Sequence, residues 1–152
     1  MGEEIKTAAE AAEAAAMPRQ HEVHSDPKAR NAADQPVPAG VKKTPASKKS
    51  PAQWAYERII MYIKNFEEGL DGEHEVAMGF TGGDAGVLKI EGMGYFDPDI
   101  VTFYGSDPTG SKTQLVQHVS QLNVMLRALP KSVEKSEPTR IGFRLAQDLE
   151  ET

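Results

Sequence analysis

The chain has 152 residues, which is enough for one domain and an appendage but too few for two ordinary hydrophobic cores. The absence of cysteine excludes disulfides and thiolate metal sites, and no apolar run approaches the roughly 20 residues that span a bilayer. Residues 51–152 carry nine Lys or Arg against sixteen Asp or Glu, which disfavours nucleic-acid binding through a basic face. We therefore expect a soluble, cytoplasmic protein that binds neither nucleic acid nor membrane.

The first third of the chain has too few apolar residues to form a core. All ten aromatic residues lie after residue 50, and the first fifty residues contain no Leu. Burial cannot then offset the entropy lost on ordering the backbone, so residues 1–49 are predicted to be a disordered Ala/Pro/Lys-rich tail with a transient helix at 3–16. A small basic cluster in this tail is interpreted as a solvated linker; it consists of Lys42, Lys43, Lys48 and Lys49.

A helix is predicted to open the folded domain. Ser50 is placed to cap it, Pro51 to occupy its first position, and Gln53 to reach back to the cap. Apolar residues at helical spacing predict the stripe that packs on a sheet: Ala55, Ile59, Tyr62, Ile63, Phe66 and Leu70. Trp54 and Met61 fall off this stripe and are predicted to be exposed, which makes them candidate interface residues.

Four strands are expected to follow. Val76, Met78 and Phe80 alternate with smaller or polar residues, and a second strand is predicted at 87–95. In that strand Gly92 and Gly94 fall on the face of Leu88 in strict alternation, and they leave room for a bulge or a close neighbour. The third and fourth strands are predicted at 100–104 and 112–117, joined as a hairpin by a Pro/Gly turn.

The last two elements are predicted as a helix and then a strand. Ser120 is placed to cap a helix ended by Pro130, with apolar residues Leu122, Met125, Leu126 and Leu129 on one face. Residues 140–146 alternate and predict a final strand, followed by an acidic tail at 147–152. The predicted fold class is therefore α+β: an antiparallel sheet of about five strands packed by two helices, in the order αββββαβ, over residues 50–146.

The motifs that suggest catalysis or phosphate binding lack the spacing or the structural context that such sites require. The segment 105–113 resembles a phosphate-binding loop, but Ser111 separates Gly110 from Lys112 and a hairpin replaces the required helix. Asp97 and Asp99 flank Pro98, and Asp-Pro-Asp is a sequence typical of a tight turn. His118, two residues before Ser120, is interpreted as a local helix-capping group. We expect no catalytic residue, no cofactor and no metal.

Several segments carry a family resemblance. They are Ser-Pro-Ala-Gln-Trp-Ala-Tyr-Glu-Arg at 50–58, His-Glu-Val-Ala at 74–77, Ile-Glu-Gly-Met-Gly-Tyr-Phe-Asp-Pro-Asp at 90–99, Gln-His-Val-Ser-Gln-Leu at 117–122 and Arg-Ile-Gly-Phe at 140–143. With these, the chain resembles a bacterial domain-of-unknown-function family, number 6173, over about residues 50–146. The resemblance implies a bacterial source and a shared fold, and it transfers no catalytic residue.

Two functional hypotheses remain open. The first is a non-enzymatic protein-interaction module, possibly a homodimer whose partner subunit covers part of the second sheet face, because no convergent polar constellation is visible. The second is a small-molecule-binding domain or small enzyme, with a pocket between the Gly92/Gly94 strand and the second helix. Its polar groups would come from Tyr95, Asp97, Asp99 and His118.

Overall fold

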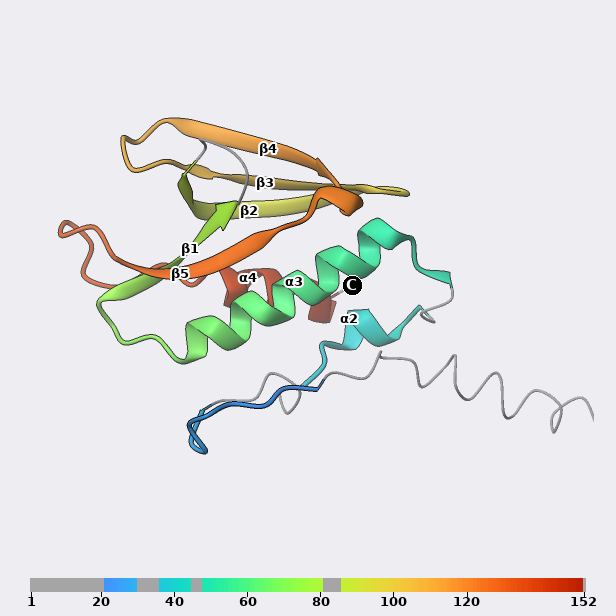
Figure 1. Cartoon of the computed structure of the whole chain (residues 1–152), viewed down its shortest axis with the longest axis horizontal. Coiled ribbons are helices and arrows are strands. Elements are labelled where there is room, and N and C mark those ends of the chain that lie inside the picture. The colour runs from blue at the N-terminus through green and yellow to red at the C-terminus, as the bar shows by residue number, and fades with distance from the viewer. Residues whose placement is uncertain (1–20, 30–35, 45–47, 81–85, 152) are drawn as a thin grey trace, which may run out of the picture.

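The computed structural model describes residues 21–29, 36–44, 48–80 and 86–151. Its elements are α2 (Ala39–Lys42), α3 (Pro51–Glu68), β1 (His74–Phe80), β2 (Val87–Phe96), β3 (Ile100–Ser106), β4 (Lys112–His118), the 3₁₀ helix η3 (Val119–Gln121), β5 (Val124–Pro130) and α4 (Ile141–Glu151) (Figure 1). The helix predicted at 3–16 lies outside the described residues.

The five strands form one sheet in the order β4-β3-β2-β1-β5, and every neighbouring pair is antiparallel. Short connections along β1 to β4 explain most of this order, because consecutive strands joined by tight turns pair directly. The helices α3 and α4 lie on one side of the sheet (Figure 1). The predicted α+β class with an antiparallel sheet is thus confirmed.

The predicted order of the last two elements is wrong. The segment predicted as a second helix at 120–129 forms the end of η3 and then β5, which pairs with β1 over seven residues from His74↔Pro130 to Phe80↔Val124. Leu126 lies opposite Met78, so its apolar side chain completes the inner face of the sheet. Strand pairing with β1 therefore overrides the helical spacing of this segment.

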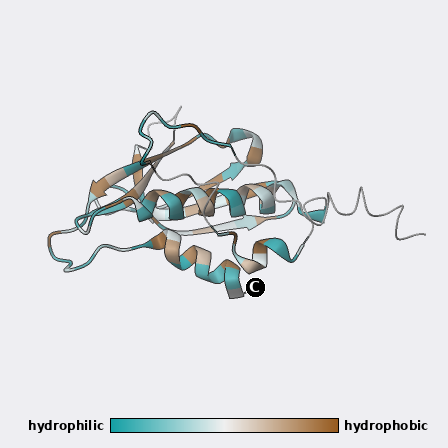
Figure 2. Ribbon diagram, turned by 90° about the horizontal axis from the view of Figure 1, so that it is seen from below, coloured by the Kyte–Doolittle hydropathy of each residue, from teal (hydrophilic) through white to brown (hydrophobic). Residues whose placement is uncertain are grey.

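The segment predicted as a final strand at 140–146 is the beginning of α4. Ile141, Leu145 and Leu149 recur at four-residue intervals and are all buried, whereas Phe143, which alternation would place with them, is 56% exposed. The predicted acidic tail at 147–152 is correspondingly helical as far as Glu151. Both helices carry hydrophilic and hydrophobic residues along their length (Figure 2), as expected when only one face of each is buried.

The helix α3 begins as predicted, and its buried face overlaps the predicted stripe: Ile63 is buried, and Ala55, Ile59, Phe66 and Leu70 pack against the core. The Ser50 side chain accepts a hydrogen bond from the Gln53 backbone N–H at 3.0 Å, with Pro51 at the first helical position. Tyr56, Ile60 and Ile63 are buried, while Tyr62 of the predicted stripe is 48% exposed.

Two further predictions needed revision. Met61 is only 6% exposed, so its predicted exposure is wrong, and Trp54 is half-buried between the Lys49 ammonium at 4.8 Å and the Arg58 guanidinium at 5.2 Å.

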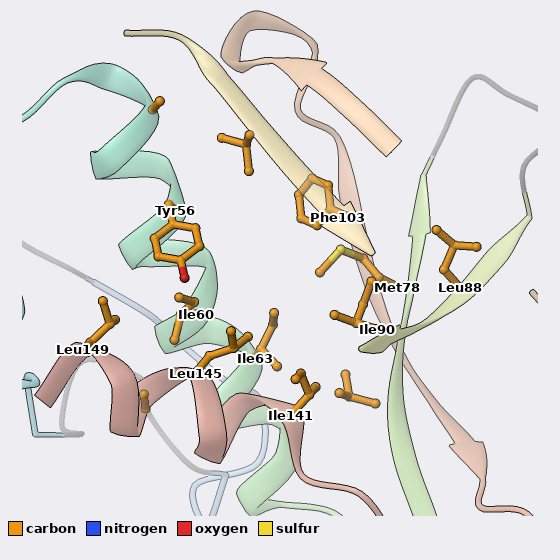
Figure 3. Close-up of a cluster of buried hydrophobic side chains, with 14 of the residues drawn as sticks. Tyr56, Ile60, Ile63, Met78, Leu88, Ile90, Phe103, Ile141, Leu145 and Leu149 are labelled. Atoms are coloured by element: carbon orange, nitrogen blue, oxygen red, sulfur yellow. The ribbon is translucent and has the colours of Figure 1, made fainter. Parts of the chain in front are cut away.

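The core lies between the two helices and the inner sheet face. Figure 3 shows side chains from α3, α4 and the strands converging on one cluster, which includes Ile60, Leu145 and Phe103. The rings of Phe80 and Phe103 meet edge to face, with centroids 5.1 Å apart. Such burial, at about 25 cal/mol per Å² of apolar surface, is the main favourable term that holds helices on the sheet.

Part of the predicted tail belongs to this core. Val41 of α2 is 1% exposed and packs in the main cluster. The Lys49 ammonium donates to the backbone carbonyl of Val41 and forms an ion pair of 2.6 Å with Glu57, whose side chain is 4% exposed. The ordered unit therefore extends on both sides of the predicted range 50–146, from α2 to the end of α4.

Candidate functional site

The most unusual feature of the sheet is that β1 and β2 pair over only three residues. Their register is Ala77↔Lys89, Met78↔Leu88 and Gly79↔Val87. Beyond Lys89, β2 continues to Phe96 and pairs with β3 alone. Among the residues that the structure describes, no strand pairs with the other side of residues 91–96. This part of β2 is therefore a free edge inside the sheet.

A β-bulge explains why the two strands separate. The register of β2 against β3 shifts between Ile90 and Gly92, so that Glu91 is the extra residue. Gly105 faces this bulge, and a Cβ atom there would overlap the carbonyl oxygen of Lys89. A bulge bends its strand and increases the local twist, which directs β2 away from β1.

The bulge also changes which side chains face the helices. Met93 and Tyr95 lie opposite Phe103 and Val101, on the inner face with Leu88. Gly92 and Gly94 lie opposite Tyr104 and Thr102, on the outer face. The predicted bulge at the glycines is present, but the expectation that they share the face of Leu88 is wrong, because the extra residue reverses the alternation.

Two adjoining hollows follow the free edge. The first is about 460 Å³ and lies between β2 and α4; its lining is Tyr56, Glu91, Gly92, Met93, Ile141, Arg144, Leu145, Gln147 and Asp148. The second is about 400 Å³; its lining is Gly40, Lys43, Thr44, Gln53, Tyr56, Glu57, Gly94, Tyr95, Asp148 and Leu149. We call the two together the β2 groove. Their volumes are within the range usual for ligand sites, about 300–1,000 Å³.

Tyr56 contributes to both hollows. Its side chain extends from α3 with the hydroxyl directed toward α4 (Figure 3), and its ring lies 5.0 Å from that of Tyr95. The residue is 8% exposed; its hydroxyl forms no hydrogen bond with another described residue, and the hydroxyl oxygen keeps contact with solvent. Burial, together with the negative charge of Asp148, raises the pKa of Tyr56 to about 12. The hydroxyl therefore remains a proton donor at neutral pH.

Most charged groups along the groove already have partners. Glu91 forms an ion pair of 3.0 Å with Lys112 and accepts a hydrogen bond from Ser106 at 2.8 Å, and these contacts hold the pKa of its carboxyl below the usual range. Glu57 is paired with Lys49. The Arg144 guanidinium, by contrast, has no hydrogen bond or ion pair within the described parts of the chain.

The predicted site residues divide into two groups. Gly92, Gly94 and Tyr95 line the groove, but its other wall is α4 and not the second helix that the pocket hypothesis placed there. Asp97, Asp99 and His118 do not line it. Asp97 accepts a hydrogen bond of 2.5 Å from Ser50, which connects the β2-β3 turn to the start of α3.

His118, Asp99 and Ser120 lie close together where β4 ends and η3 begins. The His118 Nε2 is 3.1 Å from Asp99 Oδ2, and its Nδ1 is 2.8 Å from Ser120 Oγ. The Nδ1 also accepts the Ser120 backbone N–H at 3.1 Å, and the Gln121 side chain accepts the His118 backbone N–H in return. This reciprocal pattern is a capping box for η3, in agreement with the predicted capping role of His118. Ser120 itself was predicted to be the cap, and that assignment is wrong.

The sequence did not identify Tyr56, Arg144 or Asp148 as site residues. Tyr56 lies between positions of the predicted apolar stripe, and Arg144 was placed on a strand. Helical spacing from Ile141 through Leu145 to Leu149 is the signal that would have put Arg144 and Asp148 along one side of a helix. Among the described residues, no group of three or more His, Asp or Glu side chains is arranged to bind a metal ion.

The comparisons with known proteins identify the family but no activity. Residues 47–144 match the model described as a family of unknown function, DUF6173. The chain belongs to this family. No curated protein and no solved structure matches it significantly. The DUF6173 match includes Tyr56, the whole of β2 and Arg144, and it ends before Asp148. In the parts that the structure describes, no helix has the length and apolarity needed to cross a membrane.

Proposed function

We propose that the domain is a non-enzymatic protein-interaction module that binds an extended peptide segment in the β2 groove. The segment adds a strand to the free edge of β2, between that edge and α4. Strand addition of this kind uses main-chain hydrogen bonds for affinity and side-chain pockets for specificity.

The observation that supports this proposal is the free edge opposite a helix. In an antiparallel strand, successive residues direct their N–H and C=O groups alternately to the two sides. About half of the residues at 91–96 therefore direct these groups away from β3, toward the side where no described strand pairs with them. Exposed strand edges of this type are templates for another extended chain.

The chemistry of this edge also specifies its occupant. A row of alternating backbone donors and acceptors matches an extended polypeptide better than a compact metabolite. The apolar lining from Met93, Ile141 and Leu145 suits the side chains of such a segment. Docking into the existing groove leaves α3, α4 and the sheet in place, as is usual for preorganised interfaces.

The test begins with a selection from a random peptide library displayed on phage, with the full chain as target. Each selected peptide is then synthesised with single backbone N-methyl groups placed at successive positions. We expect binding to be lost at every second position, because only alternate peptide N–H groups donate to β2. Strand addition would be contradicted if N-methylation were tolerated at every position. It would also be contradicted if binding were lost with a period near 3.6 residues.

A homodimer formed through the same edge is a separate outcome of this test. The selected peptide would then dissociate the dimer, as measured by sedimentation equilibrium with and without peptide. If the chain is a dimer that the peptide leaves intact, self-association uses another surface. The bacterial source and cytoplasmic location inferred from the sequence stay predictions.

A further inference from the structure

We infer that the peptide bound in the β2 groove carries an acidic side chain, held by Arg144 and by the hydroxyl of Tyr56. This inference rests on the proposed peptide-binding function and adds the chemistry of the partner. It concerns the first hollow, beside Gly92, where both donors line the same space. An acidic residue of a partner protein is the occupant that the two groups fit.

The two donors lack acceptors within the described structure. Arg144 is exposed, and its guanidinium presents five N–H donors in a planar fork that matches a carboxylate. The Tyr56 hydroxyl lines the same hollow, keeps contact with solvent and forms no hydrogen bond with another described residue. A ligand carboxylate supplies the acceptors.

The acidic groups near the first hollow do not occupy these donors. Glu91 forms an ion pair with Lys112 and accepts a hydrogen bond from Ser106. Asp148 lines both hollows one helical turn after Arg144 and takes part in another interaction of the chain, as does Lys43 of the second hollow. Asp148 lines the first hollow too, and its negative charge opposes an anion there, so the attraction for an acidic side chain comes from Arg144. The acidic side chain is therefore expected at the end near Gly92 and Ile141, away from Gly94.

The shape of the groove favours an internal acidic residue over a chain terminus. Beyond Gly92 the space continues toward Gly94 and Leu149 in the second hollow. At the other end, Glu91 and Ile141 also line a smaller hollow of about 120 Å³ that reaches Lys89 and Thr139. Because space continues on both sides of Arg144, a peptide chain can pass the guanidinium instead of ending there.

The test compares peptide selections against the full-length wild type, Arg144→Glu, Tyr56→Phe and Arg127→Glu. Arg127→Glu is the matched control. Arg127 lies opposite Ala77 on the outer face of the sheet, so this substitution makes the same change of charge outside the groove. We expect wild type and Arg127→Glu to select Asp or Glu at one fixed position. Arg144→Glu is expected to select Lys or Arg at that position.

Measured affinities make the inference quantitative. Replacing the acidic residue of a selected peptide with its amide is expected to weaken wild-type binding at least about tenfold, because hydrogen bonds to charged groups are the strong ones. The same replacement should strengthen binding to Arg144→Glu, because it removes a like-charge repulsion. In Tyr56→Phe, which keeps the ring and removes the hydroxyl, the loss should be smaller than in the wild type.

Two results would overturn the inference while leaving strand addition intact. One is a period-two response to N-methylation with no acidic preference in the wild type. The other is an unchanged acidic preference in Arg144→Glu. A selected peptide without the period-two response would instead contradict the proposed function itself, so the two failures are distinguishable.

Discussion

The carboxylate of Glu67 on α3 accepts hydrogen bonds from the backbone N–H groups of Gly142 at 2.9 Å and of Phe143 at 3.1 Å. These are among the first N–H groups of α4, which have no partner within their own helix. A Cβ on Gly142 would lie 2.7 Å from the Glu67 carboxylate and 2.9 Å from the Ile63 side chain. Glu67 therefore caps α4 from a distant part of the sequence, and the glycine permits the close approach of the helices.

Replacing Glu67 with Ala should destabilise the protein by at least about 1–2 kcal/mol, the cost of losing a helix cap. The expected effect appears as a lower midpoint in urea unfolding with an unchanged slope. Glu137→Ala is the control, because Glu137 is exposed and has no contact of this kind. Equal midpoints for Glu67→Ala and the wild type would refute the capping role.

The pH dependence of stability should show how much the carboxylate of Glu75 contributes. This residue is contacted by the loop after β5. Glu75 is 5% exposed, accepts the Thr139 backbone N–H at 2.6 Å and lies 3.2 Å from the Lys135 ammonium. Burial raises the pKa of this carboxyl, but the Thr139 and Lys135 contacts outweigh burial and leave the pKa below its ordinary value of 4.5. Its contribution to stability is therefore present above pH 4.5 and is lost as the pH falls through the lower folded-state pKa.

The pKa of Glu67 is shifted in the opposite direction to that of Glu75. Burial raises the pKa of Glu67, despite the lowering effect of the Gly142 and Phe143 hydrogen bonds. The contribution of Glu67 to folding stability is fully present below pH 4.5 and decreases as the pH rises through its folded-state pKa. In urea unfolding at several pH values, Glu75→Gln should reduce the loss of stability in acid, whereas Glu67→Gln should steepen it. The same acid profile in Glu75→Gln and wild type would contradict the assigned role of Glu75.

The buried pair of Lys49 and Glu57 should be costly to break on one side only. Lys49→Met leaves the Glu57 carboxylate buried without its cation, and such changes cost about 3–5 kcal/mol. The double variant Lys49→Met/Glu57→Leu is expected to recover most of this loss, because it removes both charges from an environment where the side chains are 1% and 4% exposed. A double variant no more stable than Lys49→Met would show that the pair does not act as a unit.

Gly105 should tolerate no larger residue. A Cβ at this position overlaps the backbone oxygen of Lys89 across the bulge, and backbone atoms cannot move aside cheaply. Gly105→Ala is expected to lose roughly 1–3 kcal/mol, as overpacking typically does. Gly72→Ala is the matched control, since nothing lies within 4 Å of the added atom. Equal thermal stability of the two variants would contradict the described bulge.

The sequence predicted the regions whose signals are local. The Ser50 cap, the alternation of Val76, Met78 and Phe80, and the hairpin between β3 and β4 depend on neighbouring residues and were found. The sequence also favoured a bulge at the glycines of β2. It could not show that this bulge separates β2 from β1, because that outcome depends on twist and on packing across the sheet.

The two errors at the C-terminal end have a common physical cause. The segment from Leu122 to Leu129 fits helical spacing, yet pairing with β1 decides its conformation. The segment from Ile141 fits alternation, and no residue just before it supplies a cap, because the cap is Glu67. Since Arg144 was consequently placed on a strand, the wall of the groove formed by α4 was not recognised.

The most direct test of the free edge is amide hydrogen exchange, measured residue by residue by NMR, with and without a selected peptide. In the free protein, alternate amides at 91–96 should exchange rapidly, while those bonded to β3 are protected. Addition of the peptide should protect the rapidly exchanging set. Protection of all six amides before the peptide is added, or rapid exchange that persists at saturating peptide, would contradict strand addition at β2.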